Sequence, residues 1–222
     1  HTGKRNFFND AVGIHSAGHQ RPQPVHQLRG AGLLLNIPQL ANPVEARQRL
    51  PHQILQFDLS EEFPILTTKF VAFKTAVLEM LWFYQAQSND VRWLKERGIK
   101  IWNEWEIDED GFYQGKEFGK EFAHTIGTAY GWIVNKYQLT QSLIETLKTD
   151  PSNRRMVMSL WQNEWLETAA LPSCVWNSQW NLIDGRLNIL VTSRSSDVPL
   201  GLPFNVVQYA VLCNLIAQSV GA

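Results

Sequence analysis

The sequence has few cysteines and almost no net charge. Its 222 residues include two cysteines, Cys174 and Cys213, and the formal net charge is −1. A secreted fold of this length usually uses more cysteines, in pairs, so the count favours a reducing, cytoplasmic environment. The near-neutral charge argues against a general nucleic-acid-binding protein, which would carry a basic excess.

Long apolar runs and a signal peptide are also missing. No stretch approaches the ~20 apolar residues of a membrane span, and residues 1–5 lack both the apolar core of a signal peptide and an initiator methionine. We therefore expect a soluble protein without a membrane segment. Its 44% hydrophobic content can bury a core, most simply as one domain. The nine tryptophans favour a stacking surface for a flat ligand, although tryptophan is more often core.

The first 52 residues differ from the rest of the chain. Residues 18–51 are rich in Gln, Arg, Pro and His and show no sustained period of 3.6 or 2. We interpret residues 1–52 as a poorly specified N-terminal segment with one short helix over residues 44–50. Residues 53–222 read as a folded catalytic domain.

Hydrophobic periodicity predicts the first elements of this domain. Residues 54–59 alternate as a strand does, and a broad apolar stripe predicts a helix over residues 69–85. The hydroxyls of Thr67 and Thr68 are the expected N-cap of that helix. Further helices are predicted over residues 91–97 and residues 139–149, the second stopped by Asp150-Pro151.

The last third of the chain predicts strands followed by a helix. The strands cover residues 156–161, 175–183 and 187–193, and Asp184-Gly185 indicates a hairpin between the last two. An apolar helix over residues 205–220 follows, with Asn205 as its cap. Helices that accompany strands without strict βαβ alternation predict an α+β fold with a mixed sheet.

Cys174 is the candidate nucleophile. It lies where a loop enters a strand, a usual place for a presented side chain. A buried cysteine that acts as a small hydrophobe is the more common alternative, and it suits Cys213 in the apolar final helix. Cys174 differs because arginines lie in the segments that flank it, and a nearby positive charge favours the reactive thiolate.

Arginines and hydroxyls near strand ends are candidate anion ligands. Arg154 and Arg155 lead one strand, and Arg194 ends another and precedes Ser195. Phosphate recognition needs fork-like donors together with hydroxyls, and these residues supply both. Solvated charges at strand ends are the alternative for each residue taken alone.

Two further polar residues lie in apolar surroundings. Glu79 is inside an apolar helix, where burial would raise its pKa toward the range useful for proton transfer; the alternative is the polar edge of the helix. The Asn205 amide offers a donor and an acceptor together, which matches the edge of uracil, and helix capping is the alternative.

Taken in order, these segments resemble thymidylate synthase. The resemblance spans residues 53–218 and rests on an ordered set of motifs rather than on one. The motifs are Pro64-Ile65-Leu66-Thr67-Thr68-Lys69, Glu79-Met80-Leu81-Trp82, Ile101-Trp102-Asn103-Glu104-Trp105, Thr128-Ala129-Tyr130-Gly131, Asn153-Arg154-Arg155, Ala170-Leu171-Pro172-Ser173-Cys174, Arg194-Ser195-Ser196-Asp197 and Leu200-Gly201-Leu202-Pro203-Phe204-Asn205.

The resemblance implies an α+β enzyme that dimerises through its sheet and converts dUMP to dTMP. The reduced folate 5,10-methylenetetrahydrofolate would be the carbon donor and reductant, without a metal. Cys174 would add to uracil C6, Glu79 would organise proton transfer through water, and Tyr130 would lie near the reacting carbon. The remaining roles implied are phosphate binding by Arg194 and Ser195 with Arg154 and Arg155 of the other subunit, uracil recognition by Asn205, pterin binding by Asp197, and a folate pocket shaped by Trp102, Trp105, Leu200 and Gly201.

The sequence departs from the family pattern at both ends. Residues 40–50 do not reproduce the arginine-rich phosphate loop, and the family continues beyond Ala222 with a sugar-binding His and Tyr and a closing segment. We therefore expect a domain truncated at its C-terminus. The alternatives are a pyrimidine nucleotide hydroxymethylase, against which Asn205 and Trp102 argue, and a non-catalytic nucleotide-binding relative.

Overall fold

The computed structural model describes residues 53–222. The chain divides into two compact units, and their described parts are residues 53–71 and residues 72–222. The first of these contains neither helix nor strand. The helix expected over residues 44–50 lies outside the described residues.

The strand predicted over residues 54–59 is wrong because Asp58 builds a turn. Its Oδ1 accepts hydrogen bonds from the backbone N–H and the hydroxyl of Ser60, at 3.0 and 2.7 Å. Its carbonyl accepts from the N–H groups of Glu61 and Glu62. An aspartate that bonds its own backbone two residues on favours a turn over a strand ladder.

The second unit begins with helix α1, Phe73–Met80, which continues into a π-helical turn, Leu81–Gln85. The helix predicted over residues 69–85 is therefore confirmed, but it starts four residues later. Thr67 and Thr68 do not cap it, since Ala72 precedes its first turn. Phe70, at the start of the predicted apolar stripe, is 87% exposed and therefore does not contribute to a buried helical face.

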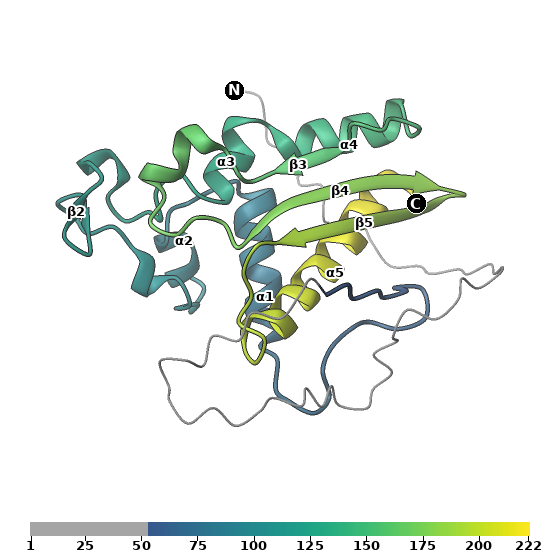
Figure 1. The fold of residues 1–222 in the computed structure, drawn as a ribbon, viewed down its shortest axis with the longest axis horizontal. Coiled ribbons are helices and arrows are strands. Elements are labelled where there is room, and N and C mark those ends of the chain that lie inside the picture. The colour runs from purple at the N-terminus through teal and green to yellow at the C-terminus, as the bar shows by residue number, and fades with distance from the viewer. Residues whose placement is uncertain (1–52) are drawn as a thin grey trace. The chain divides into compact units, whose positions relative to one another are not determined.

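Four further helices follow along the chain (Figure 1). The short helices α2 and α3 cover Arg92–Lys95 and Gly131–Lys136, α4 covers Leu139–Thr149, and α5 covers Gly201–Val220. Single 3-10 turns lie at Asn103–Trp105, Lys120–Phe122 and Asn163–Thr168. The helix predicted over residues 139–149 is confirmed with its bounds, and that over residues 91–97 is confirmed but shorter.

Helix α5 begins at Gly201, four residues before the predicted start, so Asn205 is not its cap. Asp197 organises this start: its Oδ1 accepts the N–H of Leu200, and its carbonyl accepts the N–H of Leu202. Pro203 fits the first turn because the N–H groups there lack helical partners in any case. Asn205 is thereby free to serve a purpose other than capping.

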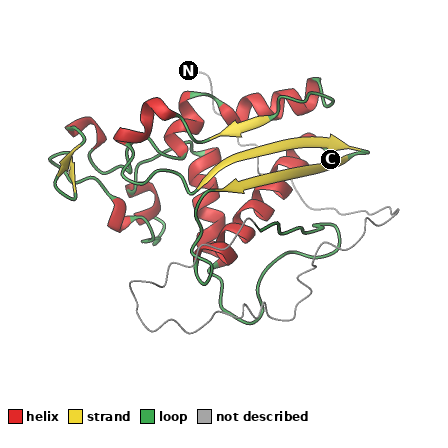
Figure 2. Cartoon of the chain, in the orientation of Figure 1, coloured by secondary structure: helices red, strands yellow, loops and turns green. Residues whose placement is uncertain are grey.

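Two antiparallel sheets are formed (Figure 2). The small one pairs β1, Phe112–Tyr113, with β2, Lys116–Glu117. The larger one has the order β3-β4-β5, from Val157–Ser159, Val175–Ile183 and Arg186–Ser193. The α+β class is confirmed, while the pairs in the described residues are antiparallel throughout rather than mixed.

The predicted hairpin at Asp184-Gly185 joins β4 to β5. Both residues have positive φ, 50° and 74°, as a two-residue turn between right-twisted strands requires. One face of the sheet is buried, with Met158, Ser178 and Trp180 no more than 2% exposed. Helix α5 packs against α1 and continues behind the β4–β5 hairpin (Figure 1), so that the core lies between these helices and the sheet.

Candidate active site

Cys174 lies at the end of a loop, directly before β4, and is half-buried. The hydroxyl of Tyr130 accepts the backbone N–H of Cys174 at 2.9 Å. The Cys174 carbonyl accepts the N–H of Arg194 at 2.9 Å and the hydroxyl of Ser193 at 3.2 Å. Both peptide groups of the candidate nucleophile are thus held in place by long-range contacts.

Arg194 holds the loop that presents Cys174. Its Nε donates to the carbonyl of Ser173 at 3.0 Å, and its Nη2 donates to the carbonyl of Pro172 at 2.8 Å. The guanidinium also lies 5.2 Å from the ring centre of Trp161. The structure therefore brings Arg194 to the loop that presents Cys174 and ties that loop to the end of β5.

Glu79 is on the buried face of α1, with 5% of its surface exposed. The indole Nε1 of Trp102 and the amide Nε2 of Gln208 each donate to one of its carboxylate oxygens. Burial raises the pKa of Glu79 to about 7, although both hydrogen bonds lower it. The sequence left the polar helix edge open as an alternative, and the structure places Glu79 inside.

Tyr130 connects the Glu79 and Cys174 surroundings. Its ring stacks on Phe83 at 4.5 Å and meets the edge of Trp102 at 5.5 Å. Burial, and next the nearby Cys174, raises the pKa of Tyr130 far above its ordinary value. It precedes α3 with φ of 44°, an unusual backbone for a non-glycine residue, and such positions gather at functional sites.

The π-helical turn Leu81–Gln85 supplies further aromatic residues. Phe83 stacks on Tyr130, and the hydroxyl of Tyr84 lies 3.2 Å from that of Tyr209 on α5. Burial raises the pKa of Tyr84 to about 12 and that of Tyr209 well above its ordinary value. π-helical turns are uncommon, and they occur often at functional sites. This one places aromatic side chains against Tyr130 and Tyr209.

Asn205 joins the same group of residues through Gln208. Its Nδ2 donates to Gln208 Oε1 at 2.8 Å, and Gln208 Nε2 donates to Glu79. Sequence reasoning missed Gln208. The signal was present, since Gln208 interrupts an apolar run of the final helix, as Glu79 does in its own helix, three residues after Asn205.

Several predicted site residues lie apart from Cys174 in this chain. Arg154 and Arg155 are exposed in the loop before β3, where they line a concavity of about 220 Å³ with Asp150, Ser152 and Asn153. Ser195, exposed just after β5, lies closer: its carbonyl accepts the hydroxyl of Ser193 at 2.7 Å, and the same hydroxyl contacts the Cys174 carbonyl. Trp105 contacts Tyr113 at 6.1 Å beside the small sheet.

Comparison with known proteins is consistent across sequence and structure. The sequence profile of the thymidylate synthase family matches residues 44–222. The chain is 50% identical over 173 residues to a thymidylate synthase of Clostridium beijerinckii, covering 78% of this chain and 60% of that protein. For a thymidylate synthase of Bacillus licheniformis the values are 43% over 176 residues, 75% and 58%. The chain belongs to the thymidylate synthase family.

The thymidylate synthase fold is confirmed by a solved structure. The thermostable thymidylate synthase A from Bacillus subtilis is 41% identical, with a TM-score of 0.65, and the match covers 74% of this chain and 57% of that one. The chain thus spans about 60% of the length of the curated relatives it matches. The resemblance that the ordered motifs indicated is confirmed.

The resemblance to thymidylate synthase predicted that Trp102 lines a folate pocket. In the structure Trp102 is 7% exposed and donates to Glu79, a contact that the sequence did not indicate. Leu200, by contrast, is 66% exposed and directly precedes Gly201, the first residue of α5. Leu200 and Gly201 thus lie at the start of α5, next to Asp197, where a ligand could reach them.

Residues 53–222 contain neither a metal-binding cluster nor a membrane-spanning helix. No group of three or more His, Cys, Asp or Glu side chains in this part of the chain could hold a metal ion. None of the helices described is both long and apolar enough to cross a bilayer.

Proposed function

We propose that Cys174 serves the reductive methylation of dUMP to dTMP with 5,10-methylenetetrahydrofolate. The observation that carries this proposal is the buried Glu79. It has a pKa of about 7 and belongs to the same cluster of contacting residues as Cys174. Tyr130 joins the two, through its hydrogen bond to Cys174 and its place beside Trp102. A thiol nucleophile with a near-neutral acid suits covalent activation of a pyrimidine ring.

The chemistry follows from the two groups. The Cys174 thiolate would form a bond to uracil C6, the C5–C6 double bond would open, and charge would move to the C4 oxygen. Glu79, through water, would stabilise that oxygen and return protons at later steps, because an acid with a pKa near 7 both donates and accepts at neutral pH. The folate would supply the one-carbon unit and the hydride.

The experiment is a product assay on the full-length polypeptide that carries this sequence. With dUMP and methylenetetrahydrofolate we expect dTMP and dihydrofolate in equal amounts. Cys174→Ala should lower kcat by about 10⁴-fold or more, since no other group replaces the nucleophile. Cys213→Ala is the matched control: its thiol is buried in α5 with a pKa raised to about 11 by burial, and its loss should leave kcat unchanged.

Two results would contradict the proposal. Activity that survives Cys174→Ala excludes the covalent mechanism. Hydroxymethyl-dUMP as the main product would mean that water, rather than hydride, quenches the activated carbon.

We also propose that the open face of the larger sheet forms a homodimer. Val157, Gln179 and Leu190 are aligned across its three strands, and Val157 and Leu190 are 45% and 60% exposed. On the same face Asn181 Oδ1 is shielded from solvent and accepts no hydrogen bond from any described residue. An apolar stripe with an unsatisfied polar atom suits a self-complementary interface.

A dimer would also give Arg154 and Arg155 a task, because each would reach the partner's phosphate site. Arg155→Ala and Cys174→Ala, each inactive alone, would then form mixed dimers with one intact site. Random mixing should restore about a quarter of the normal activity. No restoration, although mixed dimers form, would show that each chain uses its own arginines.

A further inference from the structure

Both hydrogen-bond partners of Glu79 donate to it. Trp102 Nε1 contacts one carboxylate oxygen and Gln208 Nε2 contacts the other. An ionised carboxylate only accepts hydrogen bonds, so this arrangement suits the charged form. The pKa of Glu79 is nevertheless raised to about 7 by burial, so the carboxyl is protonated in part of the protein at neutral pH.

A protonated Glu79 needs an acceptor for its O–H, and its two partners differ in their ability to provide one. The indole of Trp102 has an N–H donor and no acceptor. The amide of Gln208 has both, but its oxygen now faces Asn205. Protonation of Glu79 therefore favours a half-turn of the Gln208 amide, because a buried donor without an acceptor costs free energy.

A half-turn of the Gln208 amide also affects Asn205. In the present arrangement Gln208 Oε1 accepts from Asn205 Nδ2 at 2.8 Å. After a half-turn, Gln208 Nε2 would face Asn205, and two N–H donors would oppose each other unless the Asn205 amide also turned. Asn205 is half-buried, so its side chain is not fully enclosed by the described residues.

We infer that Gln208 is a positioning residue that couples the protonation of Glu79 to the orientation of the Asn205 amide. With Glu79 ionised, Asn205 presents its Oδ1 acceptor; with Glu79 protonated, it presents its Nδ2 donor. The inference rests on the proposed function for the identity of the ligand. Uracil N3–H pairs with an acceptor, whereas unprotonated cytosine N3 pairs with a donor, so Glu79 would set which base is read.

The other titratable groups around Glu79 are tyrosines. Tyr130, before α3, and Tyr209, on α5, both interact with its charge, and Tyr84 on the π-turn contacts Tyr209. Burial keeps the pKa of each of the three above the ordinary tyrosine value. They stay neutral between about pH 5.5 and 8.5, so among Glu79 and these three tyrosines it is Glu79 that titrates there; Cys174 faces the cluster from the far side of Tyr130.

The test follows side-chain amide signals by NMR in the ligand-free, full-length protein. In the unaltered protein the Asn205 and Gln208 amide signals should both shift with pH, with one midpoint near that of Glu79. Gln208→Met keeps nearly the same shape and removes both donor and acceptor. In this variant the Asn205 signal should stop titrating, and the Glu79 midpoint, followed by its carboxyl infrared band, should rise by about one pH unit.

Two further variants make the comparison sharp. Gln218→Met makes the same change at an exposed position of α5 and should leave the Asn205 titration unchanged. Gln208→Glu retains an acceptor for Asn205 but places a second carboxyl against Glu79, so the two should share one proton and the midpoint of the pair should rise. Gln208→Glu takes the place of Gln208→Met in this test if Gln208→Met does not fold.

A second measurement brings in the ligand. The ratio of dUMP to dCMP affinity should fall about tenfold as the pH decreases through the Glu79 midpoint. Both nucleotides carry the same phosphate, so its titration cancels from the ratio. Gln208→Met should make the ratio independent of pH.

The outcomes separate the two ideas. An Asn205 signal that does not titrate in the unaltered protein, or that titrates equally in Gln208→Met, overturns the coupling whatever the enzyme catalyses. A protein that binds neither nucleotide contradicts the proposed function, while the ligand-free titration still decides the role of Gln208.

Discussion

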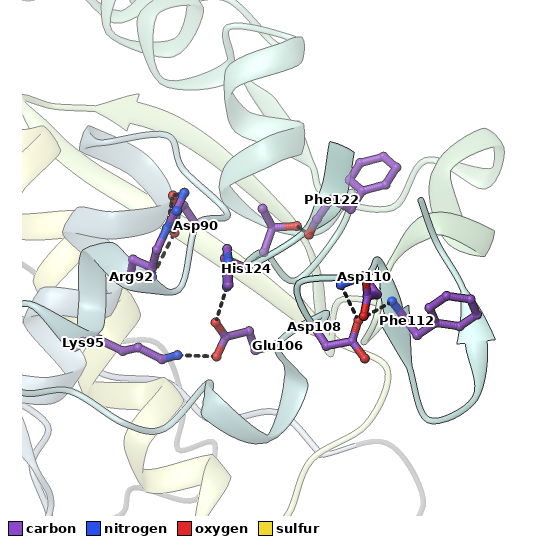
Figure 3. Close-up of polar contacts among 10 residues, drawn as sticks. Asp90, Arg92, Lys95, Glu106, Asp108, Asp110, Phe112, Phe122 and His124 are labelled. Carbon is purple, nitrogen blue, oxygen red and sulfur yellow. Dashed lines mark hydrogen bonds and ion pairs between the residues drawn. The ribbon is translucent and has the colours of Figure 1, made fainter. Parts of the chain in front are cut away.

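Two regions of the molecule hold carboxylates in opposite ways. In the Cys174 cluster, Glu79 is buried and receives hydrogen bonds from the neutral Trp102 and Gln208. Around α2 and the following loop, carboxylates that are only partly buried pair with basic side chains: Asp90 with Arg92, and Glu106 with Lys95 and His124 (Figure 3).

The pKa values follow the difference in partners. Burial alone raises the pKa of Glu79, since neutral donors cannot compensate for the loss of water. Burial also acts on Asp90, but the hydrogen bonds and the charge of Arg92 outweigh it, and the pKa of Asp90 is lowered. Arg92 thus keeps Asp90 charged, whereas the buried region keeps a proton exchangeable at neutral pH.

Nearby, Asp108 illustrates a third use of a carboxylate, with no cation involved. Its Oδ1 accepts the N–H groups of Asp110 and Phe112 at 3.0 and 2.8 Å and so shapes the turn that leads into β1 (Figure 3). Side-chain bonds of this kind stabilise turns. The acidic character of this segment is therefore structural, in contrast to that of Glu79.

Of the changes that test this comparison of carboxylates, the largest effect is expected where the exchangeable proton is removed. Glu79→Gln retains the shape and a hydrogen-bonding group but cannot transfer a proton. We expect kcat for dTMP formation to fall about 10²- to 10⁴-fold, with a smaller change in the KM for dUMP. Steady-state kinetics measure this, and Glu106→Gln, in the partly buried pair with Lys95, is the control that should retain activity. Equal loss in both variants would erase the distinction between the two regions.

The same substitution changes how stability depends on pH. The pKa of Glu79 is about 7 in the folded protein and 4.5 is its ordinary value. Below the ordinary value both states hold the proton; as the pH rises to about 7, the unfolded chain releases it first and stability is lost. This gap corresponds to about 3 kcal/mol. The free energy of unfolding of Glu79→Gln, relative to the unaltered protein, should therefore rise by about this amount between about pH 4 and pH 8.

Urea unfolding at several pH values checks this sign. A relative stability that falls with increasing pH would mean that Glu79 gains more from its two donors than it loses by burial. The carboxylate would then behave as those at the surface do.

Tyr130 tests how firmly the buried region positions the nucleophile. Tyr130→Phe keeps the stacked ring and removes the acceptor of the Cys174 N–H. We expect a loss of about 1–2 kcal/mol in the free energy of unfolding. Tyr113→Phe is the matched control, because the Tyr113 hydroxyl accepts a hydrogen bond from the exposed Gln114. A similar cost for both would indicate that the Tyr130 hydroxyl has no special task at Cys174.

The sequence predicted the parts of this site that depend on local patterns. Glu79 stood out because it interrupts an apolar stripe, and Cys174 because it falls between a loop and a strand. Both placements agree with the structure. The start of α5 was missed because Asn205 was interpreted as the cap, whereas the helix begins at Gly201, next to Asp197.

The contacts that define the chemistry could not be predicted in this way. Trp102 donates to Glu79 from 23 residues away, and Gln208 does so from 129 residues away. Hydrophobic periodicity shows that a side chain is buried but not which element covers it. The family resemblance supplied an ordered list of residues, and it too left out Gln208.

The smallest effect is expected at the surface. Lys95 contacts Glu106 with 40% of its side chain exposed, and Glu106 keeps a second partner, His124, at 3.2 Å. Lys95→Met should lower the free energy of unfolding by less than about 1 kcal/mol, because water and salt screen an exposed pair. Urea unfolding should show the difference shrinking further in high salt, whereas the cost of Tyr130→Phe should stay the same. A large, salt-insensitive loss in Lys95→Met would mean that this pair is held as tightly as the buried cluster.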